Sequence, residues 1–200
     1  MEKPDIVKLM NTPDVIFFIG RSGAGKGTQA KVLAERLDFF YWEMGAVLRG
    51  EIAKKSAIGV EIADLVNKGL FLDDHHITQV IDSHLDDIPK GKSIVFDGVP
   101  RRLSQAYYML GLLHGLGRRD MVTLFLDVPR EDSIDRLHHR AEIEHRVDDT
   151  DEIIAKRLDQ FELETAPVLD YLEEMTKFYR LDGRPPIPEV TAAINSIMES

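Results

Sequence analysis

A lysine stands among closely spaced glycines near the start of the chain, in the stretch GRSGAGKGTQA. Phosphates bind where several backbone N–H groups converge at a helix N-terminus, and glycines let the backbone curl around the oxygens without Cβ clashes. The glycines that supply this freedom are Gly20, Gly23, Gly25 and Gly27. Lys26 adds an ammonium that can reach the β- and γ-phosphates of a nucleoside triphosphate. The stretch predicts a phosphate-binding loop, and the alternative is an ordinary glycine-rich turn with a surface lysine.

Arginine is the second residue type here that suits phosphate chemistry. Phosphoryl transfer spreads negative charge over the moving oxygens, and a protein assists it mainly through positioning and electrostatics. Two arginines lie four residues apart on an expected helix and so share one face, and two more lie eleven apart, about three helical turns. Two others follow expected strand ends. The candidates are Arg49, Arg101, Arg136, Arg140, Arg146 and Arg157. For any one of them, the alternative is a solvated surface charge.

Strand-like and helix-like segments alternate along the chain and must position these groups. Apolar runs typical of buried parallel strands lie at 15–19, 93–96 and 121–128, with weaker ones at 39–42 and 177–181. Amphipathic stretches of helical spacing separate them. The pattern predicts an α/β fold in a single domain over residues 1–200, with a five-stranded parallel sheet, helices on both faces and ligands beyond the carboxyl ends of the strands.

Two further features concern the middle of the chain and its overall composition. The stretch 45–84 is helical in pattern and interrupted at Gly59 and Gly69, which predicts a helical insertion between two strands. The net charge of −10 argues against a nucleic-acid or anionic-membrane partner. The absence of cysteine excludes disulfides, thiol catalysis and cysteine-based zinc sites. The run VIFFI is too short for a signal-peptide core or a membrane span, so we expect a cytoplasmic protein.

Ordered motifs carry a family resemblance. The residue after Lys26 is Gly27, where serine or threonine is usual in phosphate-binding loops, and the hydroxyl comes one place later at Thr28. The string GKGTQA resembles the adenylate kinase branch of the nucleoside monophosphate kinases. Further motifs in that family's order are MGAVLR at 44–49, DGVPR at 97–101 with Gln105 after it, LDVP at 126–129 and RVDDTDEIIAKRL at 146–158. The resemblance runs from about residue 15 to the end and implies the three-layer fold of P-loop NTPases.

What the resemblance implies is reversible, Mg²⁺-dependent phosphoryl transfer from ATP to AMP, giving two ADP. The residues it places in catalysis are Lys26, Arg101, Arg140, Arg146 and Arg157. Those it places at ATP are Gly23, Ala24, Gly25, Lys26, Gly27, Thr28 and Arg136. Those it places at AMP are Met44, Arg49, Leu72, Gly98, Arg101 and Gln105. Asp97, at a strand end, would face Mg²⁺ through water, because this ion keeps much of its hydration shell, and its alternative role is a turn or helix cap.

The sequence departs from the family pattern at several positions. Met44 stands where the family has threonine or serine, and Ala46 where it has an aspartate near the metal's water shell. The acceptor-binding insertion is expected at 45–74. Only AEIEH separates Arg140 from Arg146, so the expected lid at 137–147 resembles that of short-form kinases. Without cysteines a zinc-binding lid is excluded, and we expect solvated or packing roles for His138, His139 and His145.

Other functions remain open at this level. The amide of Gln105 can pair with adenine, cytosine or guanine, so its chemistry leaves a UMP/CMP kinase possible, and the family resemblance favours adenine. A nucleotide-binding regulator without turnover is supported only by Ala46. A GTPase switch is disfavoured because no N-K-x-D motif occurs. The expected partners are ATP and AMP, without nucleic acid or membrane, and the expected state is a monomer.

Overall fold

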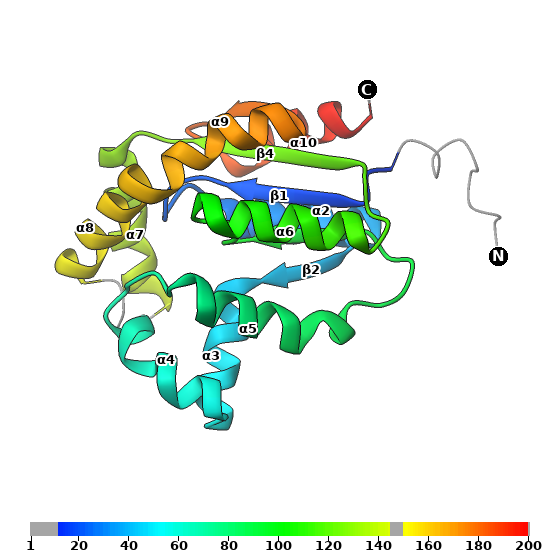
Figure 1. The fold of residues 1–200 in the computed structure, drawn as a ribbon. Helices are drawn as coiled ribbons and strands as arrows, with labels where there is room; N and C mark the ends of the chain where they lie inside the picture. The colour runs from blue at the N-terminus through cyan, green and yellow to red at the C-terminus, as the bar shows by residue number, and fades with distance from the viewer. Residues whose placement is uncertain (1–11, 145–149, 200) are drawn as a thin grey trace.

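Parallel strands form the centre of the molecule (Figure 1). The structure, a computed structural model, describes residues 12–144 and 150–199. Within these residues the sheet has five strands in the order β2-β3-β1-β4-β5, and every neighbouring pair is parallel. The strands are β1 (Val15–Ile19), β2 (Phe40–Glu43), β3 (Ile94–Asp97), β4 (Met121–Asp127) and β5 (Lys177–Asp182). The predicted five-stranded α/β fold is confirmed.

Some strand ends differ by one residue from the sequence prediction. We expected strands at 39–42 and 93–96, whereas β2 and β3 end one place later, at Glu43 and Asp97. These two residues are register partners in the parallel ladder. Backbone hydrogen bonds extend a strand regardless of side-chain polarity, so the ladder includes charged residues at which a hydrophobicity pattern stops. The same effect places Asp182 in β5, whereas β4 ends at Asp127, one residue earlier than expected.

Helices connect the strands and cover both faces of the sheet. They are α2 (Lys26–Leu37), α3 (Met44–Lys54), α4 (Ala57–Asn67), α5 (Asp74–His84), α6 (Leu103–Gly115), α7 (Arg130–Glu144), α8 (Asp151–Gln160), α9 (Ala166–Met175) and α10 (Ile187–Met198), with a 3₁₀ turn η1 (Leu85–Asp87) and a π-helical turn η2 (Phe161–Thr165). Among the described residues, no helix is both long and apolar enough to span a membrane.

The two faces of the sheet pack into separate cores. Ile16 and Phe18 of β1 belong to a core that includes residues of α2 and α10. Val15 and Phe17, which alternate with them, belong to a second core shared with α5, α6 and α9. This period of two follows from the pleat of a strand, so a continuous apolar run is what a strand covered on both faces requires. The result is the predicted three-layer arrangement.

The chain between β2 and β3 forms a helical insertion, α3 to α5, set below the sheet in Figure 1. Gly59 does not interrupt it, as the sequence had suggested, but lies inside α4. A Cβ at Gly59 would come 2.1 Å from the carbonyl oxygen of Glu51, so glycine is needed there because α3 and α4 pack in direct contact. Gly69, with φ of +69°, does follow the end of α4.

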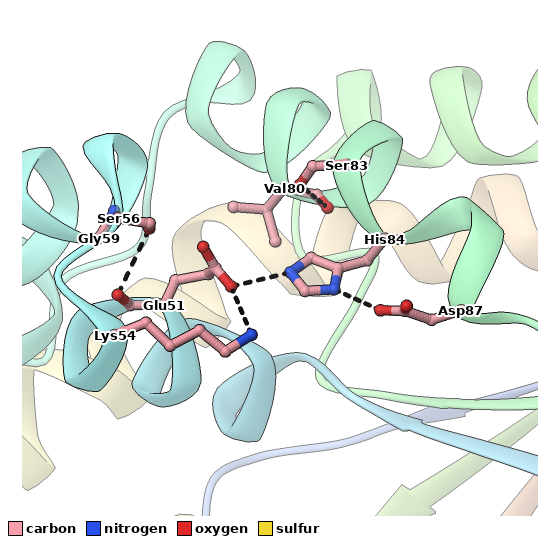
Figure 2. A network of polar contacts seen from close by, with 8 residues as sticks. All are labelled: Glu51, Lys54, Ser56, Gly59, Val80, Ser83, His84 and Asp87. Carbon is pink, nitrogen blue, oxygen red and sulfur yellow. Dashed lines mark hydrogen bonds and ion pairs between the residues drawn. The ribbon is translucent and has the colours of Figure 1, made fainter.

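A polar network ties the ends of this insertion together (Figure 2). The buried carboxylate of Glu51 on α3 lies 3.3 Å from the ammonium of Lys54 and 3.2 Å from Nε2 of His84 at the end of α5. The other ring nitrogen of His84 bonds Asp87 at 2.6 Å. Ser56 caps α4 by accepting a hydrogen bond from the Gly59 N–H. These contacts connect α3 to α5 directly, so the insertion has polar contacts that do not involve the sheet.

The connections after β1 and β3 begin side by side. These two strands are neighbours, and Phe18 pairs with Asp97 in their register. The chain leaves β1 toward one edge of the sheet and later crosses to β4 on the other side of β1. Ligands of such open sheets bind at the point where the strand order reverses, beyond the carboxyl ends. The loops at 20–25 and 98–102 therefore mark the place to look for a site.

Candidate active site

The glycine-rich loop joins β1 to α2 in the geometry that the sequence predicts. Gly23 and Gly25 have φ of +83° and +90°, in the left-handed region that favours glycine. A Cβ at Gly23 would lie 2.6 Å from the carbonyl oxygen of Ser133, so the loop packs closely on α7. Gly25 precedes α2 and no side chain caps this helix among the described residues. The first N–H groups of α2 are therefore available to an anion.

Lys26 lies folded over this loop. Its Nζ donates hydrogen bonds to the carbonyl oxygens of Gly20 and Arg21, both at 2.8 Å. Burial lowers the pKa of Lys26 to about 8; the carboxylate of Asp97 opposes this shift, and nearby arginines add to it. The carboxylate of Asp97 thus does not fully offset the cost of burying the ammonium, and a phosphate beside Lys26 would stabilise its charged form.

Asp97 lies buried at the end of β3, beside the loop. The hydroxyl of Tyr41 donates a hydrogen bond to its Oδ2 at 3.1 Å. A Cβ at Gly27 would come 3.2 Å from the same oxygen, so glycine at this position leaves the carboxylate facing the start of α2. Burial raises the pKa of Asp97, while Lys26 and the Tyr41 hydroxyl oppose that shift. The carboxylate is an oxygen ligand placed next to the phosphate-binding loop.

Arg101 follows Asp97 and extends into the same cleft. Its guanidinium lies over the ring of Phe71, 4.5 Å from the centroid, and its Nε donates to the carbonyl of Gly98 at 2.9 Å. Burial lowers the pKa of Arg101 to about 10; repulsion from Arg157 adds to this shift and Asp97 opposes it. An anion bound beside both arginines would reduce this repulsion.

A single cleft collects these groups from distant parts of the chain. The side chains that matter most in its lining are Lys26, Phe71, Arg101, Arg157, Phe161 and Thr165. Figure 1 shows α7 and α8 beyond the carboxyl ends of the strands. Arg157 of α8 lines the cleft together with residues of both loops. Arg140 on α7 is near enough to lower the pKa of Lys26. The cleft can therefore neutralise several phosphate oxygens at once.

The remaining predicted ATP residues lie at or near the loop. Ala24 is buried, whereas Thr28 is exposed on the first turn of α2. Arg136 lies on α7, and its guanidinium donates to the carbonyl oxygens of Gly183 and Arg184 at 2.8 and 2.9 Å. Arg146 lies outside the described residues, as does part of the expected lid.

Of the predicted AMP residues, Gly98 and Arg101 line this cleft. Met44 and Leu72 are buried, and Gly98 has φ of +85°. Arg49 donates to Glu43 at 2.8 Å. Gln105 is buried at 4% exposure, its Oε1 accepts the N–H of Arg101 at 2.9 Å, and its Nε2 lies 3.5 Å from Asp74. The structure thus brings Gln105 and Arg101 together and leaves Arg49 in a separate ion pair.

Sequence reasoning missed the aromatic residues of the site. Tyr41 alternates with the core residue Trp42 in β2, and its bond to Asp97 depends on the β2–β3 register. Phe71 lies between α4 and α5, in a stretch without helical or strand periodicity. The one available signal was proximity in sequence, because Phe71 precedes the predicted AMP residue Leu72.

Comparison with known proteins gives consistent results. The family model described as adenylate kinase matches residues 18–177. An adenylate kinase of Thermus thermophilus is 33% identical over 189 residues, which cover 94% of this chain and 99% of the relative. An adenylate kinase of Cyanothece sp. is 35% identical, covering 92% of this chain and 94% of the relative. One of Phocaeicola vulgatus is 33% identical, covering 92% and 97%.

Proposed function

Because the chain belongs to the adenylate kinase family, we propose that it catalyses reversible phosphoryl transfer from ATP to AMP, giving two ADP, in the cleft described above. The observation that supports this most is the convergence of Lys26, Arg101 and Arg157 on one cleft beside the glycine-rich loop. A phosphate oxygen of AMP attacks the γ-phosphorus of ATP, and the bond to the β,γ-bridging oxygen breaks. Such a transfer needs positioning and charge neutralisation and no covalent enzyme intermediate.

The roles within the cleft follow from where each group lies. ATP binds with its phosphates on the loop and the N-terminus of α2, where Lys26 exchanges its carbonyl partners for phosphate oxygens. AMP places its phosphate at Arg101, with the insertion over 45–74 around it. Arg140 and Arg157 neutralise the moving phosphoryl group, joined by Arg146 from the short lid at 137–147. Arg136 borders the ATP base beside residues 183–184.

Mg²⁺ fits the oxygen chemistry at Asp97. Mg²⁺ takes one or two carboxylates, keeps several waters and binds phosphates, and it supplies charge neutralisation between the phosphates when bound. Asp97 offers one buried carboxylate beside the loop. Across the described residues no group of three or more acidic or histidine side chains could hold a metal, so most ligands would come from water and ATP. A monomeric cytoplasmic enzyme without nucleic-acid or membrane partners remains a prediction.

Turnover with different acceptors tests the proposed function. We expect ATP-dependent phosphorylation of AMP, with the highest kcat/KM among AMP, GMP, CMP and UMP. A coupled assay of ADP formation measures it. Faster turnover of CMP or UMP than of AMP would contradict the adenylate assignment, and no turnover of any of the four would support the regulator.

Acceptor selectivity should depend on Gln105. We expect Gln105→Ala to lose ~1–3 kcal/mol of discrimination for AMP over the other monophosphates, because a buried base edge goes unpaired. The alanine variant also frees the N–H of Arg101. Gln105→Glu is the comparison variant, since it keeps that acceptor while a charged carboxylate oxygen replaces the amide donor beside Asp74. If the alanine variant alone loses discrimination, Gln105 acts through Arg101 and does not read the base.

The lowered pKa of Lys26 predicts a pH dependence. In the empty protein Lys26 is charged below about pH 8 and neutral above it. We therefore expect kcat/KM for ATP to fall roughly tenfold per pH unit above that value. Under saturating ATP, kcat should persist to higher pH, because bound phosphates raise the pKa.

The stability of the empty protein should rise with pH over the range in which kcat/KM for ATP falls. Between about pH 8 and the ordinary lysine value of 10.5, the unfolded chain holds a proton that the folded chain has released. Lys26 therefore makes the folded state more stable as pH rises through this window. Thermal melting at different pH values measures this change in stability. Steady-state kinetics measures the fall in kcat/KM for ATP. A kcat/KM that stays level up to about pH 9.5 would contradict the role of Lys26.

A further inference from the structure

Arg21 is a residue of the phosphate-binding loop to which the proposed mechanism gives no task. Its main-chain oxygen accepts one of the two hydrogen bonds from Lys26. Its side chain, 22% exposed, contacts η2 and the end of β4. An arginine in such a loop could bind phosphate directly. The geometry here instead joins the loop to a second element.

The contacts of the Arg21 side chain are specific. Its guanidinium lies over the ring of Phe161, 5.0 Å from the centroid, and its Nη1 donates to the carbonyl of Val128 at 3.1 Å. Asp127 and Glu162 lie 3.8 and 3.7 Å from its nitrogens. Its buried Nε has no hydrogen-bond partner among the described residues, although the Glu162 carboxylate faces it. Each of these carboxylates also pairs with a second arginine at 3.2 Å, Glu162 with Arg130 and Asp127 with Arg180.

The segment that Arg21 contacts also holds the acceptor side of the cleft. Thr165, at the end of η2, donates a hydrogen bond to the main-chain oxygen of Arg101 at 3.0 Å. Glu164 pairs with Arg102. Arg157 lies four residues before Phe161 in the continuous helix formed by α8 and η2. Single π-helical turns inside α-helices are frequent at functional sites. Here η2 touches the loop, Arg101 and the helix that carries Arg157.

Resting on the proposed function, we propose that Arg21 is a positioning residue that clamps the phosphate-binding loop to η2 and so sets Lys26 relative to Arg101 and Arg157. The clamp acts through Phe161 and Glu162 on one side and the Lys26 hydrogen bond on the other. Its loss removes no phosphate-binding side chain but lets the loop and η2 move apart, so that Lys26 shifts relative to Arg101 and Arg157. Misplacement of reacting groups by about 1 Å can cost ~10²-fold in rate.

Kinetics of a double-mutant cycle tests the clamp. We expect Arg21→Met and Glu162→Gln each to lower kcat ~10-fold, with KM for ATP and AMP changed about twofold or less. The double variant should lose about as much as one single variant, whereas independent effects would multiply to ~10²-fold. Arg36→Met is the matched control, because this α2 arginine forms an ion pair with Glu199 at 2.8 Å, and its kcat should not change. Melting temperatures show that each variant is folded.

Amide hydrogen exchange tests the clamp without turnover. Glu162→Gln should accelerate exchange of the amides at 20–25, although Glu162 lies far along the chain, and Arg21→Met should accelerate exchange at 161–165. Unchanged exchange in both variants would overturn the clamp. So would a raised KM for ATP with unchanged kcat in Arg21→Met, which would show that the guanidinium binds phosphate. Failure of the wild-type protein to turn over ATP and AMP would contradict the proposed function alone, because exchange still reports on the clamp.

Discussion

Replacing Lys26 with methionine is expected to lower kcat by ~10²–10³-fold, the loss found when one preorganised charge partner of a transition state is removed. Methionine keeps a long unbranched side chain and removes the ammonium. Among the described residues, that ammonium donates hydrogen bonds to the loop carbonyls of Gly20 and Arg21, and its burial lowers the pKa of Lys26. Its charge is therefore stabilised by phosphate more than by the empty protein, and its contribution grows as charge develops.

Steady-state kinetics with ATP and AMP measures this effect. Lys92→Met is the matched control, since Lys92 pairs with Asp38 at 2.6 Å before β3, at the opposite end of the strands. We expect its kcat to stay within about twofold of wild type, as is usual for exposed ion pairs away from a site. A melting scan should show both variants folded. A Lys26→Met enzyme with near wild-type kcat would remove Lys26 from the mechanism.

The fold could be predicted from sequence where a single physical cause dominates. The runs that become β1 and β4 are apolar throughout because both faces of these strands are covered, and their positions were predicted closely. The ends of β2 and β3 were not, since Glu43 and Asp97 continue a ladder whose hydrogen bonds ignore polarity. The prediction that Gly59 interrupts the helical insertion failed for a related reason. Close packing of α3 on α4 demands glycine there, and that contact is invisible in a local pattern.

The site also contains residues that a local sequence pattern reveals and residues that only the folded structure reveals. The residues of the phosphate-binding loop are consecutive in sequence, so the loop can be recognised from its glycines and Lys26. The partners of Asp97 and Arg101 depend on long-range geometry: Tyr41 lies 56 positions before Asp97, and Phe71 comes from the insertion. Arg49 illustrates the limit of motif reasoning, because the motif does not reveal the ion pair that its guanidinium forms with Glu43.

Replacing Arg101 with methionine is expected to lower kcat/KM for AMP by ~10²–10³-fold, because a charged donor to the acceptor phosphate is lost. The same change should leave the melting temperature of the empty protein unchanged or raised. Burial and the repulsion from Arg157 both disfavour the charged guanidinium, which its lowered pKa reports. Opposing these costs are its bond to Gly98 and its contact with Phe71, which a methionine side chain partly retains as apolar packing.

Activity and stability therefore report on different partners of one arginine. Kinetics measures the interaction with phosphate, and melting with and without nucleotides measures the cost of holding the cation ready; the stabilisation by AMP should shrink in the variant. Arg118→Met is the matched control, because this half-buried arginine donates to the carbonyl of Asp14 at the opposite end of the sheet and should change neither kcat/KM nor the effect of AMP. If Arg101→Met instead melts well below wild type and keeps its kcat/KM for AMP, Arg101 stabilises the fold and another group holds the acceptor phosphate.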